Sequence, residues 1–140
     1  MRAKIQHAFT LVEILIVVVI LAILAVLTVP RMLSATEDAA TNSTLTDLHK
    51  IRNHVAVYRA RENMNPPVQA GNGTWGPLIG RDYLAAAPTN AWIGGANSRV
   101  ITLGNAPDVA YHTNYGWIYD PATGDVWAAG MDGDDQPLPR

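Results

Sequence analysis

The stretch Phe9-Thr10-Leu11-Val12-Glu13 opens a long apolar run near the N-terminus of this chain. Glu13 is the only charged residue in the run, and the next charge is Arg31. At a rise of about 1.5 Å per residue, Phe9 to Val29 form a helix of about 32 Å, which is enough to cross the hydrocarbon core of a bilayer. The sequence therefore predicts a membrane helix over residues 9–30.

Glu13 is the chemically conspicuous residue of this helix. A carboxylate inside a membrane helix costs on the order of a few kcal/mol, and for that reason such acids usually mark a functional pairing. The alternative is an acid near the helix end whose side chain reaches the aqueous interface. We expect Glu13 to have a partner.

Residues 1–8 are short and basic, with Arg2 and Lys4, and by the positive-inside tendency they stay in the cytoplasm while the rest of the chain is delivered outward. An ordinary secretory signal, cut near Ser34-Ala35, begins in a similar way. Three features argue against it: the acid inside the apolar region, the length of that region, and Pro30-Arg31 beside the cut.

The segment Ala8-Phe-Thr-Leu-Val-Glu13, followed by the apolar run and Pro30, resembles the class III signal of the type IV pilin family, which includes the pseudopilins of type II secretion. The resemblance is dense from Arg2 to Met32 and weak beyond. It implies that a prepilin peptidase cuts between Ala8 and Phe9, methylates the new amine of Phe9, and leaves the apolar segment in place as a stalk. Ala8 departs from the Gly that usually precedes the cut.

The resemblance implies a structural subunit, not an enzyme, most like a type II secretion system major pseudopilin. The subunit would sit in the bacterial inner membrane by a single helix, with its head in the periplasm, and polymerise through that helix into a periplasmic pseudopilus. Glu13 would be its assembly residue. The implied partners are further copies of itself, the prepilin peptidase, the inner-membrane assembly platform and other pilin-like subunits. The alternative is a type IV pilus subunit or a minor tip pilin of an extracellular pilus, whose head serves adhesion, motility or DNA uptake.

Charge bears on the kind of partner, and cysteine content bears on the choice between a pseudopilin and a type IV pilin. Loss of residues 1–8 lowers Lys+Arg from 10 to 8 against an Asp+Glu count of 12, so no nucleic-acid partner is expected. Five basic residues are interpreted as a solvated helix face: Arg31, Lys50, Arg52, Arg59 and Arg61.

The chain has no cysteine, so no disulfide can stabilise the head and other interactions must do so. Many type IV pilins close their C-terminal region with a disulfide, whereas the major pseudopilins that the chain resembles commonly do not.

Hydrophobic periodicity predicts that the helix continues beyond Pro30, with a kink near Leu27 to Pro30. An apolar stripe at spacings of three and four faces the head, and Asn63, Asn65 and Pro66-Pro67 stop the helix near Glu62. The stripe consists of Leu45, Leu48, Ile51, Val55 and Tyr58. One long helix is therefore expected from Phe9 to Glu62, membrane-embedded first and amphipathic over residues 31–62.

Residues 66–140 are rich in turn residues and predict short strands. Arg99 to Leu103 is one strand, and Tyr115 to Tyr119 forms a hairpin with Asp125 to Ala129. The expected fold is α+β, in which a long N-terminal helix packs on a small antiparallel sheet of three or four strands in a pilin-like head over residues 31–140. The four Trp residues are expected to pack against the helix; the alternative is a sugar-binding platform.

Catalytic motifs are not visible. His49, His54 and His112 have no Cys, Asp or Glu at a convincing metal-ligand spacing, so an enzyme is not expected. The C-terminal loop carries Asp132, Asp134 and Asp135, and oxygen-rich loops of this kind suit Ca²⁺. It loosely resembles the acidic loop with which major pseudopilins hold calcium, which implies these three residues as ligands. The alternative is a solvated acidic tail.

Overall fold

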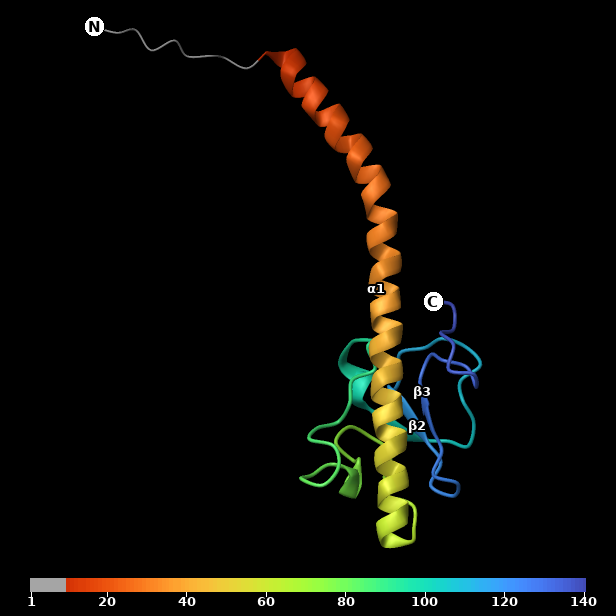
Figure 1. The fold of residues 1–140 in the computed structure, drawn as a ribbon. Coiled ribbons are helices and arrows are strands. Elements are labelled where there is room, and N and C mark those ends of the chain that lie inside the picture. The colour runs from red at the N-terminus through yellow and green to blue at the C-terminus, as the bar shows by residue number, and fades with distance from the viewer. Residues whose placement is uncertain (1–9) are drawn as a thin grey trace, which may run out of the picture. The chain divides into compact units, whose positions relative to one another are not determined.

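The computed structural model describes residues 10–140, apart from the side chains of residues 27–31 and 33. Its elements run in the order α1 (Leu11–Glu62), η1 (Gly76–Leu78), η2 (Ala96–Arg99), β1 (Ile101–Leu103), β2 (Trp117–Tyr119) and β3 (Val126–Ala128) (Figure 1). The chain divides into two compact units, one ending at Thr36 and the other covering Glu37–Arg140. Each is described by itself.

Helix α1 covers Leu11–Glu62, so the predicted end at Glu62 is confirmed. Asn63 follows in the left-handed region at φ 54°, and its N–H donates to the carbonyl of Arg59 at 2.9 Å. Asn tolerates this conformation at a helix end better than most residues do, and Pro66-Pro67 cannot extend the helix. Phe9, the predicted start, lies outside the described residues, as do the side chains of Leu27 to Pro30, where the kink was expected.

The sheet has the order β1-β2-β3 and mixes two pairings. β2 and β3 are antiparallel, which confirms the hairpin, but β1 and β2 are parallel, with Ile101 opposite Trp117. The expectation of an all-antiparallel sheet is therefore wrong for the first pair. Residues 104–116 separate the two strands. A connection of about a dozen residues is long enough to bring the chain back to the end of the sheet where β1 begins, so that β2 can run parallel to β1.

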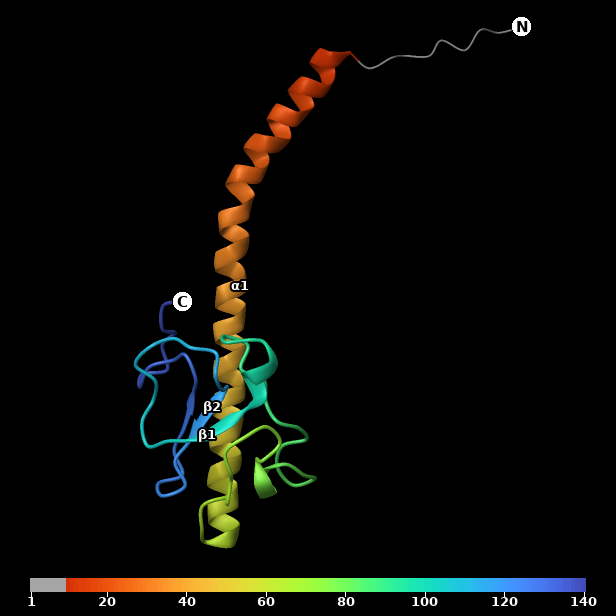
Figure 2. The same cartoon turned by 180° about the vertical axis from the view of Figure 1, so that it is seen from behind.

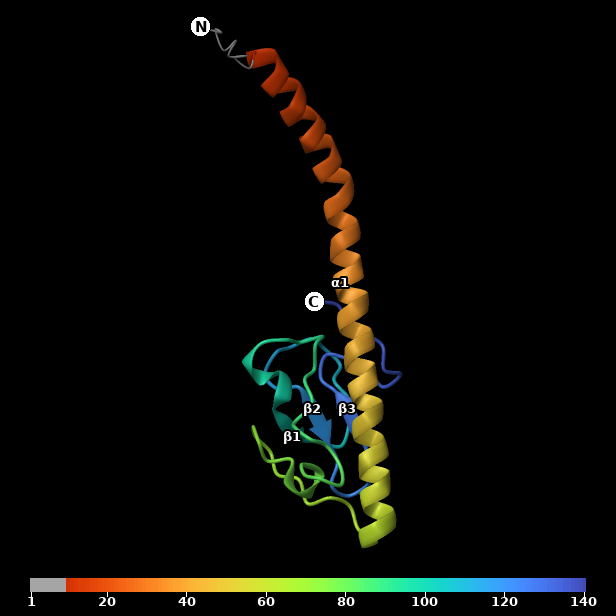
Figure 3. The same cartoon turned by 60° about the vertical axis from the view of Figure 1, so that its left-hand side comes forward.

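The apolar stripe of α1 completes the core of the head, as predicted. Leu48 and Ile51 are 0% exposed and Val55 is 2% exposed, while Leu45 and Tyr58 pack against the same cluster. Figures 2 and 3 show the sheet and its loops lying along the C-terminal part of α1. The α+β class and the helix-on-sheet packing are confirmed. The sheet needs the helix, because strands this short bury too little area to be stable alone.

Three of the four Trp residues, Trp75, Trp92 and Trp117, are core residues. Trp75 and Trp117 are fully buried with their ring centroids 6.3 Å apart, and Trp92 is 6% exposed. The indole N–H groups of Trp75 and Trp117 donate to the carbonyls of Arg99 and Pro88, each at 3.0 Å. A buried indole usually needs such a partner. Trp127 is half-buried in β3.

The side-chain amide of Asn90 is the polar centre of the head. It is 0% exposed, and its Nδ2 donates to the carbonyls of Gly116 at 2.8 Å and Ala129 at 2.9 Å. Gly116 directly precedes β2 and Ala129 directly follows β3, so this one nitrogen binds both strands at the open end of the hairpin.

The amide oxygen of Asn90 serves the opposite side of the network. Oδ1 accepts the N–H groups of Trp92 at 3.0 Å and Ile93 at 3.2 Å, and the hydroxyl of Thr44, a fully buried residue of α1, lies 3.3 Å away. Asn90 thus connects α1, the loop before η2 and the sheet through one buried group.

We expect Asn90→Ala to lower the free energy of unfolding by roughly 3 to 5 kcal/mol, since it leaves several buried donors and acceptors without partners. Asn97→Ala is the matched control, because its exposed amide makes one side-chain hydrogen bond, to the carbonyl of Thr113. The control should cost less than about 1 kcal/mol. Urea unfolding of the full-length protein in detergent, followed by the fluorescence of the buried Trp residues, measures both. Equal costs would show that the Asn90 network does not hold the head together.

Candidate functional site

Thr10 and Glu13 form a reciprocal cap at the start of α1. The backbone N–H and the hydroxyl of Thr10 donate to Oε2 of Glu13 at 2.8 and 2.9 Å, and the N–H of Glu13 donates to the Thr10 hydroxyl at 3.2 Å. This is the capping box, in which residues at the N-cap and three positions later satisfy each other's free backbone donors. The sequence reasoning missed it, although Thr10-x-x-Glu13 is its usual signature. Glu13 therefore has a partner within its own chain.

The helix surface around Glu13 is apolar on all sides and uncovered. Every large apolar side chain from Leu11 to Val26 is between 49% and 83% exposed. Leu11, Ile14, Leu15 and Val18 line a shallow apolar hollow of about 390 Å³ beside the cap. In the part of the chain that the structure describes, no helix combines the length and the apolarity needed to cross a membrane. The predicted cleavage residues Ala8 and Phe9 lie outside the described residues.

The acidic loop near the C-terminus is a closed turn. Oδ1 of Asp132 accepts the N–H groups of Asp134 at 2.9 Å and Gln136 at 2.8 Å, so this carboxylate organises the loop's own backbone. Both oxygens of Asp135 accept from the guanidinium of Arg52, at 2.6 and 2.9 Å. Arg52 is therefore not part of a solvated helix face, which corrects that expectation.

This arrangement does not fit a calcium site. Ca²⁺ needs six to eight oxygen ligands, and the carboxylate oxygens that would supply several of them already accept protein hydrogen bonds. Among the described residues, no group of three or more His, Asp or Glu side chains is placed to hold a metal ion.

A second polar cluster, which the sequence reasoning also missed, surrounds Asp108. Its carboxylate accepts the hydroxyl of Tyr115 and the N–H of Gly130, each at 2.9 Å, and lies 3.0 Å from Nε2 of His112. Burial, and next the hydrogen bond and negative charge of Asp108, raise the pKa of Tyr115 to about 12. The cluster ties the connection between β1 and β2 to the C-terminal loop. No periodic pattern could have found it, because its residues lie in irregular loops.

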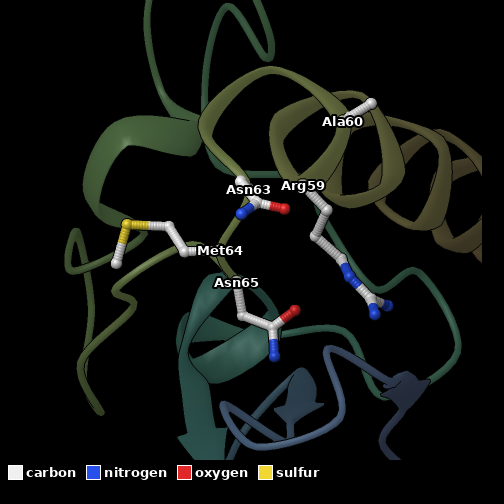
Figure 4. A pocket seen from close by; sticks show the side chains of 5 residues that line it. All are labelled: Arg59, Ala60, Asn63, Met64 and Asn65. Atoms are coloured by element: carbon white, nitrogen blue, oxygen red, sulfur yellow. The ribbon is translucent and has the colours of Figure 1, made fainter.

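A pocket of about 470 Å³ at the C-terminal end of α1 is lined by Arg59, Ala60, Asn63, Met64 and Asn65. Figure 4 shows the side chains of Met64 and Arg59 extending to opposite sides of it. Arg59 donates to the carbonyl of Thr123, and Asn65 donates to the carbonyls of Pro121 and Ala122. The polar groups of this pocket therefore hold the turn between β2 and β3.

A family model described as the prokaryotic N-terminal methylation motif matches residues 3–29, about a fifth of the chain. The chain carries a prepilin-type N-terminal segment. The match contains Ala8, Phe9 and the capped Glu13, and it supports the resemblance to type IV pilin-like subunits. These are processed by prepilin peptidase and are structural proteins. No curated protein and no solved structure matches the chain.

The capping box predicts a specific effect on the first turn of α1. Glu13→Ala should increase hydrogen exchange at the amides of Thr10 and Ile14 by about fivefold, which corresponds to about 1 kcal/mol of capping. Glu13→Gln should leave the exchange nearly unchanged, because Gln at this position can accept the same hydrogen bonds. NMR exchange rates of the full-length protein in detergent measure both. Equal rates in the two variants would contradict the cap.

Proposed function

We propose that this protein is a pilin-like subunit of a type II secretion pseudopilus. In this proposal prepilin peptidase cuts between Ala8 and Phe9 and methylates the amine of Phe9. The mature chain then polymerises through α1 into a filament that drives protein export. The observation that carries the proposal is the methylation motif at residues 3–29, joined to a helix whose apolar surface is exposed on all sides from Leu11 to Val26.

An uncovered apolar helix needs a nonpolar environment. Each Å² of apolar surface removed from water is worth about 25 cal/mol, so this segment strongly favours lipid or other helices over water. In the proposed function the apolar segment of α1 passes from one nonpolar environment, the membrane, to another, the filament. The subunit first sits in the bacterial inner membrane with its head in the periplasm. The same surface is then covered by neighbouring α1 helices as the assembly platform adds the subunit to the filament.

Glu13 sets the register of that assembly. In the free subunit the Thr10 cap satisfies the carboxylate, which lets an acid remain in an apolar segment. Cleavage creates a cation at the Phe9 amine, close to the depth of Glu13. In the filament Glu13 of an incoming subunit meets the amine of its neighbour. Such a pair adds little net stability, but leaving either charge unpaired in an apolar bundle costs several kcal/mol, about 3 to 5 kcal/mol when a buried pair loses one partner.

The secretion branch is favoured over a type IV pilus by the absence of cysteine. The major pseudopilins that the chain resembles commonly lack the C-terminal disulfide of many type IV pilins. Filaments confined to the periplasm and a defect in protein export on deletion are the results that we expect in cells. Extracellular filaments with normal export would instead identify a pilus subunit that serves adhesion, motility or DNA uptake.

Processing gives the first test of this function. We expect the mature chain to begin at Phe9 with a methylated amine, as measured by mass spectrometry of the N-terminal peptide from membranes. Ala8→Gly restores the residue that usually precedes the cut, so it should be processed at least as fast as the native chain. A mature start at Thr36 or Ala35 would identify an ordinary secretory signal and refute the filament subunit.

Substitutions of Glu13 can separate the effect of its charge on filament assembly from the effect of its capping hydrogen bonds. Glu13→Gln keeps the cap but removes the charge, so it should insert and be processed normally yet fail to enter filaments. Glu13→Ala should fail in the same way, and Glu13→Asp should retain part of the assembly. The measurement is the yield of sheared filaments relative to total membrane-bound subunit. Full polymerisation of Glu13→Gln would show that capping, and not charge pairing, is what assembly requires.

A further inference from the structure

The C-terminal loop of the head is folded around its own acidic side chains. Met131 and Pro137 form an isolated antiparallel bridge, and the N–H of Asp132 donates to the carbonyl of Gln136 at 2.9 Å. Within this closed turn Asp135 adopts the left-handed conformation, with φ 58°. A β-carbon makes that conformation unfavourable for most residues, though less so for Asp, and contacts of the Asp135 carboxylate add to what holds the residue in place.

Arg52 supplies those contacts. Its Nη1 and Nη2 atoms donate to the two carboxylate oxygens of Asp135 at 2.6 and 2.9 Å, and its Nε donates to the carbonyl of Val126 at 3.0 Å. One guanidinium from α1 thus holds both β3 and a loop 83 residues further along the chain. The side chains of Arg52 and Asp135 are only 34% and 24% exposed, so water screens this pair less than a surface pair. Paired donors of this kind give both strength and fixed geometry.

Several of the oxygens that a divalent ion would need are used by the same arrangement. Asp135 gives both carboxylate oxygens to Arg52, and Asp132 gives Oδ1 to two backbone amides. The backbone carbonyls of Asp132 and Asp134 accept from the Asp135 N–H at 3.2 Å and from Nε2 of Gln136 at 3.2 Å. A calcium ion could take these ligands only by breaking the contacts that shape the turn.

We propose that Arg52 is the cation of the C-terminal loop, and that its guanidinium holds the Asp132–Gln136 turn in the role that a divalent metal ion would otherwise have. A tethered cation differs from a metal ion in one measurable respect. A bound ion stabilises the fold according to its free concentration, whereas Arg52 is present in every molecule. The head therefore keeps its C-terminal loop closed whether calcium is abundant or absent.

The first measurement is the melting temperature of the full-length protein in detergent, with excess calcium and with a chelator. We expect the same value in both buffers. A higher melting temperature in calcium that disappears in Asp134→Ala would overturn the proposal, because it would show that the acidic loop holds the metal.

The second measurement is hydrogen exchange at the amides of the turn. Arg52→Gln and Asp135→Asn should each increase exchange on the order of tenfold, and the double variant should exchange no faster than either single variant, because both remove the same interaction. Lys50→Gln is the matched control, since it removes a cation of the same helix that forms an exposed pair with Asp47. It should leave the turn unchanged. If Arg52→Gln disturbs the whole head, Asp135→Asn still decides the matter, and native exchange in that variant would overturn the proposal.

Discussion

The buried amide of Asn90 is the interaction on which the rest of the head depends. An apolar core makes the helix and the strands pack together, but it allows many relative positions of these elements. Buried donors and acceptors are more restrictive, because each of them needs a hydrogen-bond partner in the same arrangement. Asn90 bonds to the residues that flank the hairpin and to the backbone before η2, and it lies beside Thr44 of α1. Three parts of the chain that are distant in sequence are thereby held in one arrangement.

Around this centre, α1 combines two kinds of surface within a single helix. Its C-terminal part carries a narrow stripe, including the fully buried Leu48 and Ile51, that packs into the core of the head. Its N-terminal part, Leu11 to Val26, is apolar all round and has no cover among the described residues of the chain. The first surface stabilises the head of one subunit, and the second is the surface that the proposed function assigns to lipid and then to neighbouring subunits. The capping box marks the beginning of that second surface and gives its only acid a local partner.

Polar side-chain contacts link the loops of the head to distant parts of the chain, as a disulfide often does in a small exported domain. The chain has no cysteine, and its strands are only three residues long. Arg52 holds the C-terminal turn, Asp108 joins the connection between β1 and β2 to Gly130, and Asn65 holds the turn between β2 and β3. Each tie links a loop to a distant part of the head and thereby limits how far that loop can move.

Features that depend on local periodicity and local motifs can be predicted from the amino-acid sequence. The stripe from Leu45 to Tyr58, the end of α1 at Glu62 and the β2–β3 hairpin were predictable, because backbone geometry makes each one a pattern over neighbouring residues. The N-terminal methylation motif was recognisable because its residues are contiguous in the chain. The capping box was equally local, and Thr10-x-x-Glu13 would have revealed it. Three features became visible only in the folded chain: the parallel pairing of β1 with β2, the central place of Asn90 and the pairing of Arg52 with Asp135. These depend on which loops meet after the chain has packed, and a polar side chain in an irregular segment carries no periodic signal that names its partner.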